Sequence, residues 1–120
     1  MRIGYSKNLA AMNNRDVGSN IYNISPKFCE NEIFIDLLKQ DNIHIEKIIS
    51  YGQITDIESP YIQDHDEWVL ILKGNAKLKL EAKEHNLDEG EYLLIPKGTK
   101  HWVTYTANPT IWLAIHLKGK

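Results

Sequence analysis

Residues 90–101, GEYLLIPKGTKH, place a short apolar strand between two turns and end on a histidine. Gly90 opens the segment, apolar residues follow at 92–95, and Pro96 and Gly98 turn the chain again. Because proline fixes φ and glycine tolerates positive φ, this pair predicts a rigid corner. The corner delivers His101 to a defined position at the start of the next strand.

A second segment, residues 63–74, reads QDHDEWVLILKG and places an acid, Glu67, seven positions before a turn glycine, Gly74. A charged carboxylate next to a continuous apolar run is unusual on a simple solvent-exposed strand. Taken together, the two segments predict a small β-barrel with polar side chains gathered inside it.

Short strands separated by turn residues account for the chain from Ile43 onward. Residues 76–80 alternate apolar and charged side chains, as a half-buried strand does, and Gly74-Asn75 is a tight-turn signal. Further strands are predicted near residues 43–49, 68–73, 92–95, 101–106 and 110–117. Short strands at this regular spacing indicate an all-β sandwich or barrel.

One helix is expected before the strands, over about residues 30–40. Ser25-Pro26 suits a helix entrance, and Asp41-Asn42 suits its end. Between them, apolar residues recur at helical spacing, namely Ile33, Phe34, Leu37 and Leu38. The sequence therefore predicts a short amphipathic helix packed against the outside of the sheet.

The domain organisation follows from the length of the chain and from its pattern of polar and apolar residues. A chain of 120 residues is large enough for one core and leaves no room for a second. Residues 1–20 are polar and show no sustained period, so we expect a flexible arm there. Residues 21–120 are expected to form a single domain.

Composition excludes several classes of function. The formal net charge of −2 argues against a nucleic-acid-binding protein. No apolar run approaches the roughly 20 residues that span a bilayer, and residues 1–14 lack the apolar centre of a secretory signal. Cys29 is the single cysteine, so no intrachain disulfide is possible. These features favour a cytoplasmic protein with no membrane partner.

Side-chain parity identifies the candidate site. Because strand residues alternate between faces, Tyr61, Gln63, His65 and Glu67 share one face with the apolar residues that follow. A charged glutamate inside a barrel needs a pair, a hydrogen bond or a cation, and His101 can supply a partner. Glu67 and His101 are therefore the predicted central pair, with Gln63 as the third member.

Other histidines and tyrosines are weaker candidates. Tyr105 lies four residues after His101 on the same predicted strand, so the two side chains are expected on one face. His116 likewise shares a face with other residues of the last strand. Both are candidates to line the cavity, together with Tyr61. His44 and His85 are expected on the surface.

The two segments resemble the motifs of the cupin superfamily, in particular small single-domain bacterial cupins of uncharacterised function. Glu67 and Gly74, with six residues between them, match the second half of the first motif. Gly90, Pro96, Gly98 and His101 match the second motif at every spacing. The resemblance covers roughly residues 43–117. It implies a double-stranded β-helix, which is a jelly-roll barrel, and a divalent metal ion held by the two motifs.

The implied ligand set departs from the family pattern. Counting back from Glu67, the two histidine positions of the first motif fall on Tyr61 and Gln63. One possible set is therefore Gln63, Glu67 and His101, and the other replaces Gln63 with His65 through a local bulge. The metal would be manganese, iron, zinc or nickel. A metal-free hydrogen-bonded network of the same residues is the alternative.

The resemblance implies either of two functions. One is a metal-dependent enzyme of oxygenase, isomerase or lyase type, with Glu67 and His101 as catalytic residues acting on a small polar metabolite. The other is a non-catalytic module that binds or senses a small ligand or a metal. The only arginines are Arg2 and Arg15, which counts against a phosphate-bearing substrate. We also expect a homodimer, since open sheets have edges to protect.

Overall fold

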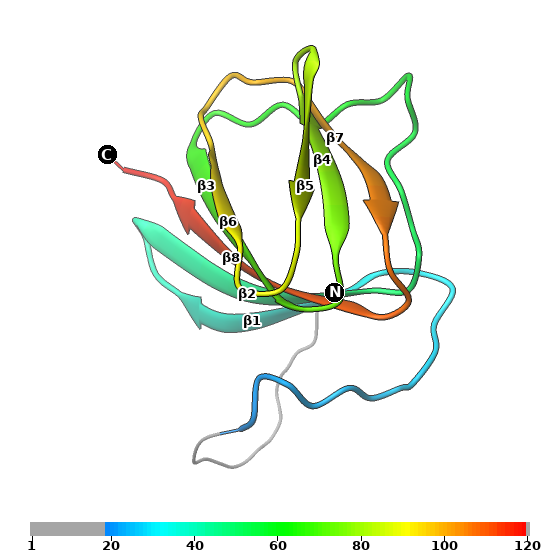
Figure 1. Cartoon of the computed structure of the whole chain (residues 1–120). Helices are drawn as coiled ribbons and strands as arrows, with labels where there is room; N and C mark the ends of the chain where they lie inside the picture. Colours follow the sequence, from blue (N-terminus) through cyan, green and yellow to red (C-terminus); the bar gives the residue numbers. More distant parts are fainter. Residues whose placement is uncertain (1–18, 120) are drawn as a thin grey trace.

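The computed structural model describes residues 19–119 and shows two antiparallel sheets that face each other (Figure 1). One sheet has five strands in the order β1-β2-β8-β3-β6, and the other has three in the order β5-β4-β7. The strands are β1 (Ile33–Lys39), β2 (Ile43–Ser50), β3 (Asp66–Lys73), β4 (Ala76–Leu80), β5 (Lys83–Leu87), β6 (Tyr92–Ile95), β7 (His101–Thr106) and β8 (Thr110–Leu117). The prediction of an all-β jelly roll is confirmed.

The expected closed barrel is wrong, because the two sheets do not join into a continuous cylinder. In the described chain, an isolated bridge joins Tyr61, in the segment before β3, to His101 of β7. Its two hydrogen bonds run from each backbone N–H to the other residue's carbonyl, at 2.9 and 3.0 Å. The molecule is therefore an open two-sheet jelly roll.

The predicted helix over residues 30–40 is also wrong, because this segment contains the edge strand β1. β1 pairs with β2 from Ile33 opposite Ile49 to Lys39 opposite His44, with a register shift between Asp36 and Leu38. This bulge breaks the two-residue alternation, so the apolar positions fall at a spacing that resembles a helix. None of the described residues forms a helix long and apolar enough to cross a bilayer.

The core lies between the sheets. Ile71 of β3, Leu78 of β4 and Ala114 of β8 are almost completely buried and pack in one cluster. Burying a side chain such as Ile71 stabilises the fold by about 1.5–3 kcal/mol. This cluster forms the closed end of the space between the sheets.

The outer face of β2 is covered by the segment that precedes β1. Lys47 is buried there and donates a hydrogen bond from Nζ to the carbonyl of Asn23. Burial lowers the pKa of Lys47. Apart from Ser19 and Asn20, the predicted arm lies outside the described residues, and the single-domain boundaries stay a prediction.

Candidate functional site

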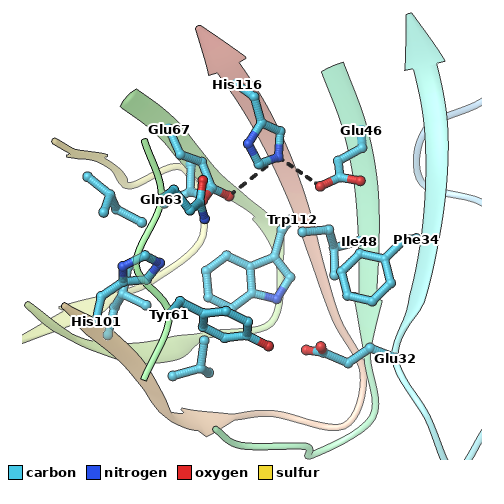
Figure 2. Close-up of a pocket in the computed structure, with 14 residues that line it drawn as sticks. Glu32, Phe34, Glu46, Ile48, Tyr61, Gln63, Glu67, His101, Trp112 and His116 are labelled. Carbon is cyan, nitrogen blue, oxygen red and sulfur yellow. Dashed lines mark hydrogen bonds and ion pairs between the residues drawn. The ribbon is translucent and has the colours of Figure 1, made fainter. Parts of the chain in front are cut away.

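A pocket of about 200 Å³ lies between the two sheets (Figure 2). Its apolar walls come from both sheets and include the indole of Trp112. Its lining residues are Glu32, Phe34, Glu46, Ile48, Tyr61, Gln63, Glu67, Val69, Leu78, Ile95, His101, Val103, Trp112 and His116. Three glutamates are among them, and no described lysine or arginine lines the pocket. Its electrostatic character therefore favours a cation or a group rich in hydrogen-bond donors.

Glu67 and Gln63 form the first polar contact in this pocket. Strand β3 holds Glu67 opposite Ile95 of β6 and opposite His116 of β8, and its side chain is buried. Gln63 Nε2 donates a hydrogen bond to Glu67 Oε1 at 2.8 Å. In this orientation Gln63 Oε1 is buried and has no hydrogen-bond partner within the described part of the chain. An unmatched buried acceptor is costly, so a donor or a cation is expected beside it.

His101 presents its second ring nitrogen as an acceptor. The ring is buried, and Nδ1 lies 3.0 Å from the carbonyl oxygen of Thr99. Because a carbonyl only accepts, Nδ1 carries the proton and Nε2 keeps its lone pair in the neutral ring. The backbone turn at Pro96 and Gly98 fixes this arrangement, as Gly98 donates its N–H to the carbonyl of Gln63.

Tyr61 lies beside His101, with their ring centroids 5.6 Å apart. Burial raises the pKa of the Tyr61 phenol, and the charges of Glu32 and Glu67 raise it further, although a hydrogen bond with Thr55 opposes them. Tyr61 is thus a neutral hydroxyl at neutral pH and a poor metal ligand. It can donate a hydrogen bond to a molecule in the pocket.

The second polar contact lies at the other side of Trp112. Ser50 Oγ donates to Glu32 Oε2 at 2.8 Å and accepts from Trp112 Nε1 at 3.0 Å. Burial raises the pKa of Glu32, and the hydrogen bond from Ser50 opposes part of that rise. Figure 2 shows Glu32 and Glu67 on opposite sides of the indole.

The structure does not bring every expected residue into the pocket. His65 does not line it; its Nε2 lies 2.9 Å from Nδ1 of His116. Tyr105 is exposed, because a register shift between β4 and β7 places Leu78 opposite Val103 but Lys77 opposite Tyr105. The extra residue turns Tyr105 away from the face of His101. Tyr61 and His116 do line the pocket.

His44 was expected on the surface, and this is wrong, since it is 6% exposed and its ring stacks on that of His116. Sequence reasoning also missed Glu46, whose Oε1 lies 2.9 Å from His116 Nε2. The available signal was the alternation of β2. His44 and Glu46 are two residues apart and therefore share a face.

Within the described residues, one group of three His, Cys, Asp or Glu side chains brings ligand atoms within 4.8 Å of one another: His44, Glu46 and His116. The alternative set of His65, Glu67 and His101 does not form such a group. The set of Gln63, Glu67 and His101 shares the pocket, and its binding of a metal stays a prediction.

The chain belongs to the cupin superfamily. The family model for the cupin domain matches residues 53–116, which include both motifs. A candidate mannose-6-phosphate isomerase of Ralstonia eutropha JMP134 is 31% identical, with a TM-score of 0.82 over 87% of this chain and 100% of that one. A cupin superfamily protein of Desulfitobacterium hafniense DCB-2 is 20% identical, with a TM-score of 0.67 over 75% of this chain and 80% of that one.

A curated relative is similar over a shorter segment. An uncharacterised protein of Aquifex aeolicus (strain VF5) is 38% identical over 55 residues. The match spans 46% of this chain and 46% of the relative, so the chain aligns with about half the length of that protein.

Proposed function

We propose that this cupin binds a small polar metabolite in the pocket between its sheets. The observation that carries the proposal is the buried Gln63 Oε1, which lies beside the buried Glu67 and lacks a partner in the described chain. A hydroxyl or amino group of the metabolite would donate to this oxygen. The apolar walls around Trp112 would cover the carbon skeleton.

The residues at the two motifs fit a divalent cation as well as a donor group. Gln63 Oε1, a carboxylate oxygen of Glu67 and Nε2 of His101 are all acceptors that line one pocket. Manganese, iron, zinc or nickel would be held by these three residues. A bound metal ion would polarise an oxygen of the metabolite as a Lewis acid.

The electrostatics of the pocket select against phosphorylated metabolites. Its R. eutropha relative is named as a candidate mannose-6-phosphate isomerase, and a phosphosugar carries a dianion. Glu32, Glu46 and Glu67 line the pocket without a described lysine or arginine beside them. We therefore propose a neutral or cationic metabolite.

Isomerase-type proton transfer is a second candidate function, and one observation favours it. Glu32 and Glu67 lie on opposite sides of the pocket, and burial raises the pKa of Glu32. In such a reaction Glu67 would accept a proton from the substrate, and a protonated Glu32 would donate one. Two carboxyl groups with different environments are typical of acid–base pairs.

Thermal shift measurements with three families of compounds test the binding proposal. Polyols, amines and sugar phosphates are added to the wild type, Gln63→Ala, Glu67→Gln and Tyr105→Ala. Polyols or amines should raise the Tm of the wild type and of the control Tyr105→Ala, whose changed side chain lies outside the pocket. They should not raise it in the two pocket variants. Stronger stabilisation by sugar phosphates, or equal shifts in all four proteins, would contradict the proposal.

A further inference from the structure

A row of polar side chains crosses three neighbouring strands of the five-stranded sheet. His44 of β2 lies directly opposite His116 of β8, and His116 lies directly opposite Glu67 of β3. Glu46 follows His44 on the same face of β2. Directly opposed residues have Cβ atoms about 4.5–5.5 Å apart, so the backbone register alone brings these groups together.

The side chains in this row converge. His116 Nε2 lies 2.9 Å from Glu46 Oε1 and 3.9 Å from Glu67 Oε2, and Figure 2 shows its ring between the two carboxylates. His44 Nε2 lies 3.9 Å from Glu46 Oε2. Because metal–ligand bonds to nitrogen and oxygen are about 2.0–2.2 Å, ligand atoms around one ion lie roughly 3–4 Å apart. The two spacings to Glu46 are close to this range, and the ligand atoms of His44, Glu46 and His116 all lie within 4.8 Å of one another.

The contacts around His116 are compatible with an additional positive charge between His116 and Glu46. A chain of contacts runs from Asp64 to His65 at 3.2 Å, from His65 to His116 at 2.9 Å, and from His116 to Glu46 at 2.9 Å. Each contact needs one hydrogen, but two neutral imidazole rings carry only two, and ionised carboxylates carry none. Neutral rings therefore leave one of the three contacts without a hydrogen, and a metal cation between His116 and Glu46 would fit there.

The same chain of contacts orients His116 for metal binding. If His65 donates from Nδ1 to Asp64, its Nε2 accepts the Nδ1 hydrogen of His116. The lone pair of His116 Nε2 then points toward Glu46. A ligand histidine whose other nitrogen donates to a neighbour is the usual arrangement in metalloproteins. His44 Nε2 lies 2.7 Å from Oδ1 of Asp36, so an ion bound by this nitrogen would replace the hydrogen of that contact and would have the Asp36 carboxylate beside it.

We propose that His44, Glu46 and His116 bind one divalent transition-metal ion, with His65 and Asp64 holding the ring of His116. Two imidazole nitrogens and one carboxylate oxygen suit ions such as Zn²⁺, Co²⁺ and Fe²⁺. This centre is formed by β2 and β8 and uses none of the motif residues Gln63, Glu67 and His101 as a ligand. It shares the pocket of the proposed metabolite site, since Glu46 and His116 line that pocket, but it takes its ligands from residues outside the motifs.

Metal titration of the full-length protein, after removal of metal with a chelator, tests this centre. Zn²⁺ binding is followed by calorimetry, and Co²⁺ binding by its visible absorption. The wild type should bind one ion at this centre. His44→Gln, Glu46→Gln and His116→Gln should each weaken binding by more than about 100-fold, since even residues that only orient a ligand contribute about 10- to 100-fold. His65→Ala should fall within that smaller range.

His101→Gln tests the motif position, and the matched control is His85→Gln, which removes a histidine of β5 that lies outside this pocket. Both variants should bind the ion as the wild type does, and circular dichroism should show that all variants are folded. In the wild type itself, Co²⁺ should broaden the ring resonances of His44 and His116 before those of His101. This measurement decides the question even if a variant fails to fold.

Three results would overturn the proposal. The first is the absence of stoichiometric binding of Zn²⁺ or Co²⁺ by the folded wild type. The second is loss of binding in His101→Gln with retention in His116→Gln, which would place the ion at the motifs. The third is early broadening of His101 rather than His116.

Discussion

Gly74 and Gly90 have nearly the same backbone conformation but different surroundings, so one pair of substitutions separates backbone strain from steric clash. Their φ angles are 86° and 84°. A Cβ at Gly90 would meet nothing within 4 Å. A Cβ at Gly74 would lie 2.6 Å from the carbonyl oxygen of Pro109 and 2.8 Å from Oγ1 of Thr110. Gly74 thus lets the β3–β4 turn approach the β7–β8 turn.

The expected losses of folding stability follow from these two environments. Gly90→Ala should destabilise the protein by about 1–2 kcal/mol, which is the cost of a left-handed conformation for a residue with a Cβ. Gly74→Ala should add about 1–3 kcal/mol of overpacking to that cost. The contacts include backbone atoms of Pro109 and Thr110, so they can be relieved only by moving the turn.

Urea denaturation followed by tryptophan fluorescence measures both variants against the wild type. Trp112 is buried, so its emission should report global unfolding. The expected result is a larger loss of unfolding free energy in Gly74→Ala than in Gly90→Ala, with unchanged m-values. Equal losses in the two variants would show that the turns do not approach each other as closely as described.

Four further predictions concern stability and assembly. Ile71→Ala should lower the free energy of unfolding by about 2–5 kcal/mol in urea denaturation, because its side chain is completely buried. Trp112→Phe should cost about 0.5–1.5 kcal/mol by the same assay through loss of the indole hydrogen bond to Ser50, in addition to the smaller ring. Because the folded protein raises the pKa of Glu32 above its ordinary value of 4.5, it binds that proton more tightly than the unfolded chain does. The contribution of Glu32 to stability is therefore greatest below pH 4.5 and is lost as the pH rises through the folded pKa. In Glu32→Gln this loss should be absent when the free energy of unfolding is measured against pH. Sedimentation at micromolar concentration should show a homodimer, since β1 is an edge strand with exposed apolar side chains; a monomer would contradict this.

The strands and turns from Ile43 onward were predictable because their signals are local. Gly74, Gly90 and Gly98 all have positive φ, as the turn chemistry required, and the strands between them follow their apolar patterns. The strand β1 was not predictable in this way. One extra residue between Asp36 and Leu38 changes which face the side chains occupy, and no local signal distinguishes such a bulge from a helical repeat.

The candidate site was predictable where it depends on the motifs. The turn before His101 and the run after Glu67 led to residues that line one pocket. His44 and Glu46 were missed because β2 is covered on both faces, by the pocket residues and by the segment before β1. When both faces are buried, alternation identifies which residues share a face but not which face holds the pocket.

The bridge between Tyr61 and His101 is the point where the two halves of the pocket wall meet. The first motif begins at the bridge, with Gln63 two residues after Tyr61, and the second motif ends there, since His101 belongs to the bridge itself. Breaking its two hydrogen bonds would cost about 1–3 kcal/mol and would leave every ladder within the two sheets intact. Loss of the bridge would therefore loosen the pocket wall at Tyr61 and His101, while the core between the sheets stays folded.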